Sequence, residues 1–192
     1  MPDHGSLEVI TGPMFSGKTD ELIRRLRRAR IARQKVQVFY PAIDSRYAGR
    51  EYGKLTSHTG TEFDAAPVRS PAEILQAVGG DTRVAAIDEA QFFDDDLVPA
   101  VQRLVDAGLR VIAAGLDTDF RGEPFGPMPL LLALADRLDK LEAICTVCGE
   151  PASRTQRLAG GRPAPAREPV VRIGDDAVYE ARCRAHHQVP RP

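Results

Sequence analysis

The sequence contains no tryptophan, only three cysteines and almost no net charge. Among its 192 residues, 26 Lys and Arg stand against 27 Asp and Glu, which gives a formal net charge of −1. This balance excludes a strongly basic surface, so neither nucleic acid nor an anionic membrane is an expected partner. The sequence also lacks an apolar run of about 18 residues, the length that a membrane-spanning helix needs.

Two further absences concern the cell compartment. Residues 1–5 have neither the basic start nor the apolar stretch of an export signal. The cysteine count is odd, and Cys145 and Cys148 are separated by only two residues, a pattern that suits a metal better than disulfides. We therefore expect a cytoplasmic protein.

Apolar runs alternate with helical patterns through residues 1–140, as in α/β proteins. Buried strands are predicted at residues 7–11, 35–40, 84–87 and 109–116. Helices are predicted over residues 18–33, from Ser70 to Gly79, from Asp94 to Gly108 and over residues 129–140. Together they predict a mostly parallel sheet flanked by helices. Six arginines of the first helix are expected on a solvated outer face or a subunit contact: Arg24, Arg25, Arg27, Arg28, Arg30 and Arg33.

The composition changes near residue 141, where we place a boundary between a domain of residues 1–140 and a lobe of residues 141–192. From Gly149 to Pro169, seven of the 21 residues are Gly or Pro, and no apolar period survives, so we predict one long loop. Short strands are predicted after it, at residues 170–173 and 177–181. A second loop is predicted at residues 47–62, which contain three glycines and little periodicity.

Residues 12–19 match the pattern G-x-x-x-x-G-K-[ST] between a predicted strand and a predicted helix. The glycines allow backbone N–H groups to turn inward around a polyphosphate, and the helix N-terminus adds positive potential. Lys18 would reach the β- and γ-phosphates, and Thr19 would hold Mg²⁺. The ATP-binding residues predicted here are Gly12, Pro13, Met14, Phe15, Ser16, Gly17, Lys18 and Thr19.

Two carboxylates, Asp88 and Glu89, directly follow the predicted strand at residues 84–87. We expect this strand to neighbour the one that precedes the phosphate loop. Asp88 can then hold Mg²⁺, directly or through water. A glutamate with an ordinary pKa near 4.3 is ionised at neutral pH, so Glu89 can take a proton from the group that attacks the γ-phosphate. The pattern leaves that group open, because the same pair activates water in ATP-driven motors.

A second motif has the ligand types and spacing of a structural zinc site. Cys145-x-x-Cys148 and Cys183-x-x-His186 are two close pairs separated by 34 residues, and four such ligands complete a tetrahedral shell. His187 is an alternative fourth ligand. Because the pairs bracket the Gly/Pro-rich segment, the metal would clamp both ends of a flexible loop at about residues 149–170, as a substrate lid requires.

These motifs closely resemble type II thymidine kinases over essentially the whole chain. The resemblance rests on GPMFSGKT, DEAQFF at residues 88–93, GLDTDFRGEPF at residues 115–125, CTVCGEPASRTQR and YEARCRAHH at residues 179–187. It implies a RecA-like P-loop domain and a small zinc-binding lobe with a lasso loop. It also implies transfer of the γ-phosphate of ATP to the 5′-hydroxyl of thymidine or deoxyuridine. Such kinases are commonly homotetramers inhibited by thymidine triphosphate.

The resemblance also assigns roles to individual residues. It makes Glu89 the general base and places Gln91 beside the nucleotide, while Asp44 and Arg46 would lie near Mg²⁺ and phosphate, with Arg46 stabilising the transition state. Apolar residues would surround the thymine: Met14, Phe92, Leu116, Phe120 and Phe125. The lasso would present backbone groups of Val170, Val171, Arg172, Ile173 and Gly174 to the base, and Tyr179 would close the site.

Two other functions are compatible with parts of the sequence. A RecA-type DNA-dependent ATPase shares the phosphate loop and the Asp-Glu pair, but the near-zero charge, the short chain and the lack of a second motor domain disfavour it. A zinc-ribbon binding module fused to a degenerate nucleotide fold is disfavoured by the intact phosphate loop.

Overall fold

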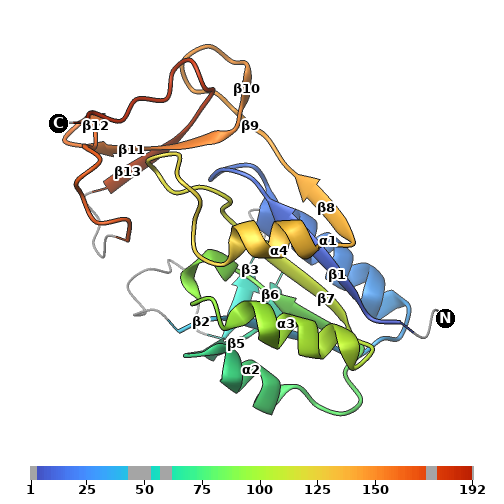
Figure 1. Ribbon diagram of the computed structural model, residues 1–192. Coiled ribbons are helices and arrows are strands. Elements are labelled where there is room, and N and C mark those ends of the chain that lie inside the picture. The colour runs from blue at the N-terminus through green and yellow to red at the C-terminus, as the bar shows by residue number, and fades with distance from the viewer. Residues whose placement is uncertain (1–3, 43–52, 57–61, 172–176, 192) are drawn as a thin grey trace.

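The computed structural model describes residues 4–42, 53–56, 62–171 and 177–191. Its centre is a six-stranded sheet in the order β5-β2-β6-β7-β1-β8 (Figure 1). The strands are β1 (Ser6–Thr11), β2 (Val36–Pro41), β5 (Ala66–Val68), β6 (Val84–Ile87), β7 (Arg110–Gly115) and β8 (Arg137–Lys140). Every pairing in this sheet is parallel, as the apolar runs predict.

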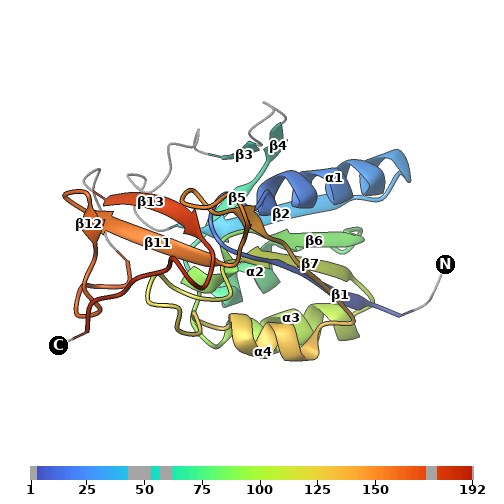
Figure 2. The ribbon, with the colours of Figure 1, turned by 90° about the horizontal axis from the view of Figure 1, so that it is seen from above.

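Helices cover both faces of the sheet (Figure 2). Helix α1 (Lys18–Ile31) covers one face, and α2 (Pro71–Ala77), α3 (Leu97–Asp106) and α4 (Met128–Leu134) cover the other. Successive residues of one strand therefore enter different cores: Val9 packs in the cluster of α2, α3 and α4, whereas Ile10 packs in that of α1.

Part of the segment predicted as a loop at residues 47–62 is a strand. β3 (Lys54–Thr56) pairs antiparallel with β4 (Glu62–Asp64). Leu55 and Phe63 from this pair are buried in the core under α1. A three-residue strand is too short for its alternation to stand out among the surrounding glycines and threonines.

The C-terminal part of the chain forms a separate antiparallel lobe to one side of the sheet (Figure 1). Its strands are β9 (Ala143–Ile144), β10 (Pro151–Ala152), β11 (Arg154–Ala159), β12 (Arg162–Pro163) and β13 (Ala177–Arg182). β9 pairs with β10, and β11 lies between β12 and β13. The predicted α/β domain with a small lobe is thus confirmed at the level of the fold.

The prediction of one long loop from Gly149 to Pro169 is wrong, because β10, β11 and β12 lie within it. Three successive residues of β11 are buried, with at most 2% exposure each: Thr155, Gln156 and Arg157. Because these buried side chains are polar, the strand shows no apolar periodicity from which it could be predicted. Gln156, for example, donates to the Gln188 carbonyl at 2.8 Å and accepts from the Gln188 N–H at 2.8 Å.

Two other elements differ from their predictions. The helix predicted over residues 129–140 ends at Leu134, and β8 follows. Asp136 ends the helical stretch because its carboxylate accepts from Leu7 N–H at 2.8 Å and its own N–H donates to the Leu7 carbonyl at 2.9 Å, which aligns β8 with β1. Of the strand predicted at residues 170–173, Val170 and Val171 lie in a bend, and the rest is outside the described residues.

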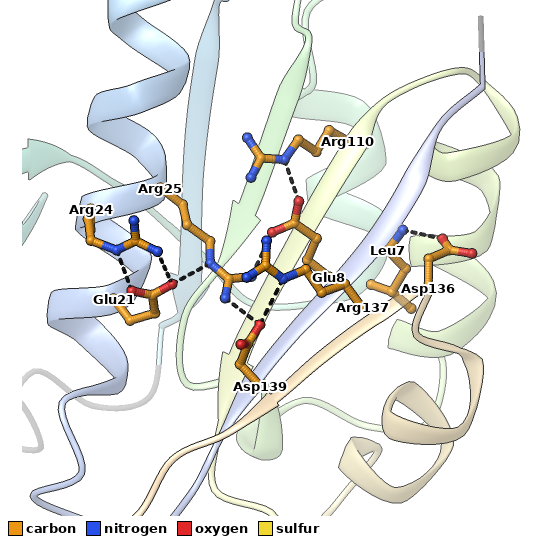
Figure 3. A network of polar contacts seen from close by, with 9 residues as sticks. All are labelled: Leu7, Glu8, Glu21, Arg24, Arg25, Arg110, Asp136, Arg137 and Asp139. Carbon is orange, nitrogen blue, oxygen red and sulfur yellow. Dashed lines mark hydrogen bonds and ion pairs between the residues drawn. The ribbon is translucent and has the colours of Figure 1, made fainter. Parts of the chain in front are cut away.

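The prediction that Arg25 lies on a solvated outer face or at a subunit contact is wrong. Its side chain is buried between α1 and the sheet and is 2% exposed. Its guanidinium contacts Glu8 on β1 at 2.6 Å, Glu21 on α1 at 2.8 Å and Asp139 on β8 at 2.6 Å (Figure 3). Glu8 also accepts from Arg110 on β7 at 2.7 Å. This Arg25 network joins α1 to three strands, and the helical period alone does not reveal a paired arginine on the inner face.

Arg25→Met should destabilise the protein by about 3–5 kcal/mol at pH 7, because it removes the buried guanidinium that three carboxylates share, those of Glu8, Glu21 and Asp139. Hydrogen bonds from Arg24 and Arg25 lower the pKa of Glu21 to about 2 from 4.5. Carboxylates with lowered pKa values stabilise the fold above pH 4.5, and this contribution is lost as the pH falls toward 2. The deficit of Arg25→Met in urea unfolding should therefore shrink below pH 4.5. A deficit no larger than that of the exposed Arg24→Met would contradict this role.

Candidate active site and metal centre

The phosphate loop joins the end of β1 to the start of α1 and has a backbone that requires glycine at two positions. Gly12 has φ +142°, and a Cβ there would lie 2.4 Å from the Leu141 carbonyl oxygen. Gly17 has φ +82° and immediately precedes α1. Phe15 has φ 67° and is 60% exposed. The loop thus has the conformation expected of a phosphate cradle.

The cation of the motif lies over this loop. Lys18 Nζ donates to the Pro13 carbonyl at 2.8 Å, and Ser16 Oγ donates to the same oxygen at 2.8 Å. An ammonium beside this loop, at the N-terminus of a 14-residue helix, creates positive potential suited to a polyphosphate. Thr19 is the next residue of α1 and is half-buried.

The carboxylate pair follows β6, but β7 separates β6 from β1. The expectation that the two motif-bearing strands are direct neighbours is therefore wrong. Both β6 and β7 are continuous apolar runs, and nothing in such runs ranks one before the other. Because carboxyl ends of parallel strands meet at one edge, Asp88 and Glu89 still belong to the edge that carries the phosphate loop. The intervening β7 ends in Gly115, which has no side chain.

Asp88 is 2% exposed and anchored by its backbone, which donates to the Phe39 carbonyl at 2.9 Å. Glu89 is half-buried and has φ 53° and ψ 39°, a left-handed conformation that costs a non-glycine residue about 1 kcal/mol or more. It directly precedes a short 3-10 helix, η2 (Ala90–Phe92). The Glu89 carboxylate accepts from the Gln91 amide at 2.6 Å.

The aromatic residues predicted around a thymine form two groups. Phe92 and Phe125 meet edge to face, with ring centroids 5.5 Å apart. Phe120 is 3% exposed, and the Arg157 guanidinium lies 3.6 Å from its ring centroid. Leu116 is half-buried and connects to the carboxylate pair, since its N–H donates to Gln91 Oε1 at 3.0 Å.

Residues from the lobe approach the same region. Met14 in the phosphate loop donates its N–H to Thr155 Oγ1 on β11 at 3.0 Å. Arg157 donates to the Val170 carbonyl at 3.2 Å and lies opposite Tyr179 in the register of β11 and β13. Val171 is half-buried. Asp44, Arg46, Arg172, Ile173 and Gly174 lie outside the described residues.

Three residues that join the lobe to this region were missed by sequence reasoning: Thr155, Arg157 and His187. His187 Nε2 lies 2.9 Å from the Phe120 carbonyl oxygen, so ring and backbone of Phe120 are both held from the lobe. Thr155 and Arg157 lie in the segment read as a loop. Apolar periodicity gives no signal for Thr155 and Arg157, because a buried polar strand has no distinctive pattern; the motif CTVCGEPASRTQR, which ends at Arg157, is the one signal that marks them.

Cys145, Cys148, Cys183 and His186 have ligand atoms that all lie within 4.8 Å of one another. Cys148 and Cys183 sulfurs are 3.8 Å apart. A tetrahedral zinc ion with Zn–S bonds of about 2.3 Å would separate its sulfurs by about 3.8 Å. The three cysteines are free of disulfides, and the donor set with this spacing fits structural zinc. His186, not His187, belongs to the group.

The surroundings of the Cys145 thiol favour a metal ligand. Burial raises the pKa of Cys145, but backbone N–H groups of Cys183, Val147 and Cys148 outweigh it and lower the pKa to about 6. The thiolate, not the thiol, is the form that binds metal. The lobe core beside the thiols is small, with Ala143, Ala152 and Ala181 as its other buried residues.

Within the part of the chain that the structure describes, helices fall short of the length and apolarity needed to cross a membrane.

The phosphate loop, the carboxylate pair and the Cys₃His group are the three features of the candidate site. A sequence model described as thymidine kinase matches residues 5–187, which include all three features. The chain belongs to the thymidine kinase family and therefore phosphorylates thymidine with ATP.

Proposed function

We propose that Glu89 is the general base of this reaction. The observation that carries the proposal is the placement of the Glu89 carboxylate at the sheet edge that also carries the phosphate loop. The backbone of Glu89 is in a strained left-handed conformation, and its carboxylate accepts a hydrogen bond from Gln91. The nucleoside 5′-oxygen attacks the γ-phosphorus, the bond from that phosphorus to the bridging oxygen of ADP breaks, and the 5′-hydroxyl proton passes to Glu89. Deoxyuridine carries the same 5′-hydroxyl and is a second substrate.

The phosphate loop, residues 12–19, binds the triphosphate of ATP through backbone N–H groups and Lys18. Thr19 and Asp88 would hold Mg²⁺, since a hydroxyl and a carboxylate are the oxygen ligands it prefers. When bound, the ion neutralises charge on the β- and γ-phosphate oxygens. Asp44 and Arg46 join this site by family resemblance, with Arg46 as a second cation for the transition state.

The nucleoside lies between the α/β domain and the lobe. Its base packs on Met14, Phe92, Leu116, Phe120 and Phe125, and its polar edge faces backbone groups of residues 170–174. Tyr179 closes the site from β13. Support comes from the links of Met14 to Thr155 and of Phe120 to Arg157 and His187, which join the two sides.

The domain boundary is placed near residue 141, and the segment at about residues 149–170, between the two ligand pairs, acts as the lid that excludes water from ATP. Reduced thiols as zinc ligands support a cytoplasmic location. Family resemblance supports a homotetramer that thymidine triphosphate inhibits. The net charge of −1 is the ground for expecting neither nucleic acid nor membrane as a partner.

A magnesium titration tests the phosphate site. Asp88→Asn should raise the Mg²⁺ concentration for half-maximal turnover by roughly 10- to 100-fold, because a neutral amide is a poorer ligand than a carboxylate. The KM for thymidine should stay within about twofold of wild type. Asp94→Asn, an exposed aspartate after the same strand, is the control. An unchanged Mg²⁺ dependence in Asp88→Asn would show that the Asp88 carboxylate does not bind Mg²⁺.

A further inference from the structure

Gln91 is a buried polar side chain with two hydrogen bonds of opposite kind. It is 2% exposed, its Nε2 donates to Glu89 Oε2 at 2.6 Å, and its Oε1 accepts from Leu116 N–H at 3.0 Å. Family resemblance suggests a contact with the nucleotide, whereas these bonds direct the amide to the protein itself.

The orientation of this amide follows from its partners. A backbone N–H only donates, so the amide oxygen must face Leu116, and the NH₂ group must then face Glu89. An ionised carboxylate only accepts, so the second bond is charge-assisted and favours one rotamer of Glu89. The amide thus cannot exchange its two ends without losing both bonds.

Two glycines make room for Gln91. A Cβ on Gly115 would lie 2.6 Å from Gln91 Oε1 and 2.9 Å from Met128 Sδ. A Cβ on Gly126 would lie 2.3 Å from the Gln91 carbonyl oxygen. Both glycines flank the segment that contains Leu116, Phe120 and Phe125. The two glycines at the ends of this predicted nucleoside-binding segment therefore leave the space that Gln91 occupies.

We propose that Gln91 is a positioning residue that fixes the Glu89 carboxylate and ties it to the nucleoside-binding segment after β7. The inference rests on the proposed role of Glu89 as the base. The geometry matters because a general base must lie within hydrogen-bond reach of the proton that it accepts, and an ångström of misplacement slows transfer sharply. Because Gln91 also accepts a hydrogen bond from Leu116 N–H, it fixes the base relative to the wall of the predicted pocket.

Gln91→Glu tests this role by altering one of the two bonds. The carboxylate retains an acceptor for Leu116 N–H but replaces the donor toward Glu89 with a second negative charge. Neighbouring carboxylates raise the pKa at which the pair ionises. The acid limb of the kcat–pH profile should therefore move up by about one pH unit or more, and kcat should recover once the pH lies well above the shifted limb.

The control is Gln102→Glu, the same charge change at an exposed position of α3, which should leave the profile as in wild type. A nucleotide contact would give another pattern in Gln91→Glu: a raised KM for ATP and an unmoved acid limb. That pattern would overturn the proposal.

Gln91→Met provides a second variant that is uncharged and of similar size. It removes both hydrogen bonds, so kcat should fall roughly 10- to 100-fold while KM for ATP and thymidine stays within about twofold. Wild-type kcat in this variant would overturn the proposal. Glu89→Gln, measured in parallel, separates the two claims. If it is inactive while both Gln91 variants behave as wild type, only the role of Gln91 fails. If it is fully active, the base assignment itself fails.

Discussion

Glu89→Gln should lower kcat for thymidine phosphorylation by roughly 10²- to 10⁴-fold, the usual contribution of a general base. An amide cannot take the 5′-hydroxyl proton at neutral pH, so the attacking oxygen remains a weak nucleophile. ATP affinity should change less than about twofold, since the phosphate loop and Asp88 are untouched. The substitution keeps the size of the side chain and leaves an oxygen to accept from Gln91.

Steady-state kinetics and binding of a non-hydrolysable ATP analogue measure the two quantities. Glu142→Gln, an exposed glutamate at the start of the lobe, is the matched control and should be indistinguishable from wild type. Near-wild-type kcat in Glu89→Gln would show that the carboxylate of this residue takes no proton.

Loss of the zinc site should have the second large effect, because the lobe has little else to hold it. Its buried apolar core beside the metal group consists of small residues: Ala143, Ala152 and Ala181. Such a core buries too little apolar area to fold alone, and small metal sites supply folding free energy directly. Cys183→Ser should therefore unfold the lobe and reduce its zinc content well below one ion per chain.

The contacts of the lobe define what is lost with it. Thr155 holds Met14, while Arg157 and His187 hold Phe120, so thymidine binding should weaken by roughly 100-fold or more. Binding of the ATP analogue should persist because the phosphate loop belongs to the sheet. Calorimetry with each ligand, together with zinc analysis, measures these outcomes.

His187→Asn distinguishes the metal from the pocket. His187 is next to a ligand but is not in the Cys₃His group, and its ring contacts Phe120 instead. This variant should retain a full complement of zinc and show only a raised KM for thymidine. Undiminished thymidine binding in zinc-depleted Cys183→Ser would contradict the structural role of the metal.

The parts of the structure that sequence predicts best are those whose physics is local. The phosphate loop follows from the spacing of Gly12, Gly17 and Lys18, since φ angles near +142° and +82° exclude other residues without strain. Strands β1, β6 and β7 follow from apolar runs, and the metal group follows from ligand spacing. The signals for the phosphate loop, for each strand and for each of the two ligand pairs lie within a few residues of chain.

The parts that sequence misses depend on partners far away in the chain. Arg25 is buried because Glu8 and Asp139 neutralise it, and neither is near it in sequence. β11 gives no apolar pattern because charged Arg157 is buried in it and packs on the distant Phe120. The place of β7 between β1 and β6 depends on sheet order, which apolar runs leave undetermined. Long-range pairing, not residue type, decides all three.

The most direct test of the proposed reaction is ADP formation from Mg·ATP with thymidine, deoxyuridine, deoxycytidine, single-stranded DNA or no acceptor. We expect ADP with thymidine and with deoxyuridine, with one molecule of the nucleoside 5′-monophosphate for each ADP. We expect only background release with DNA or without an acceptor. ADP formation that DNA stimulates, or that is equally fast without a nucleoside, would identify water as the attacking group and contradict the proposed roles of Glu89 and the lid.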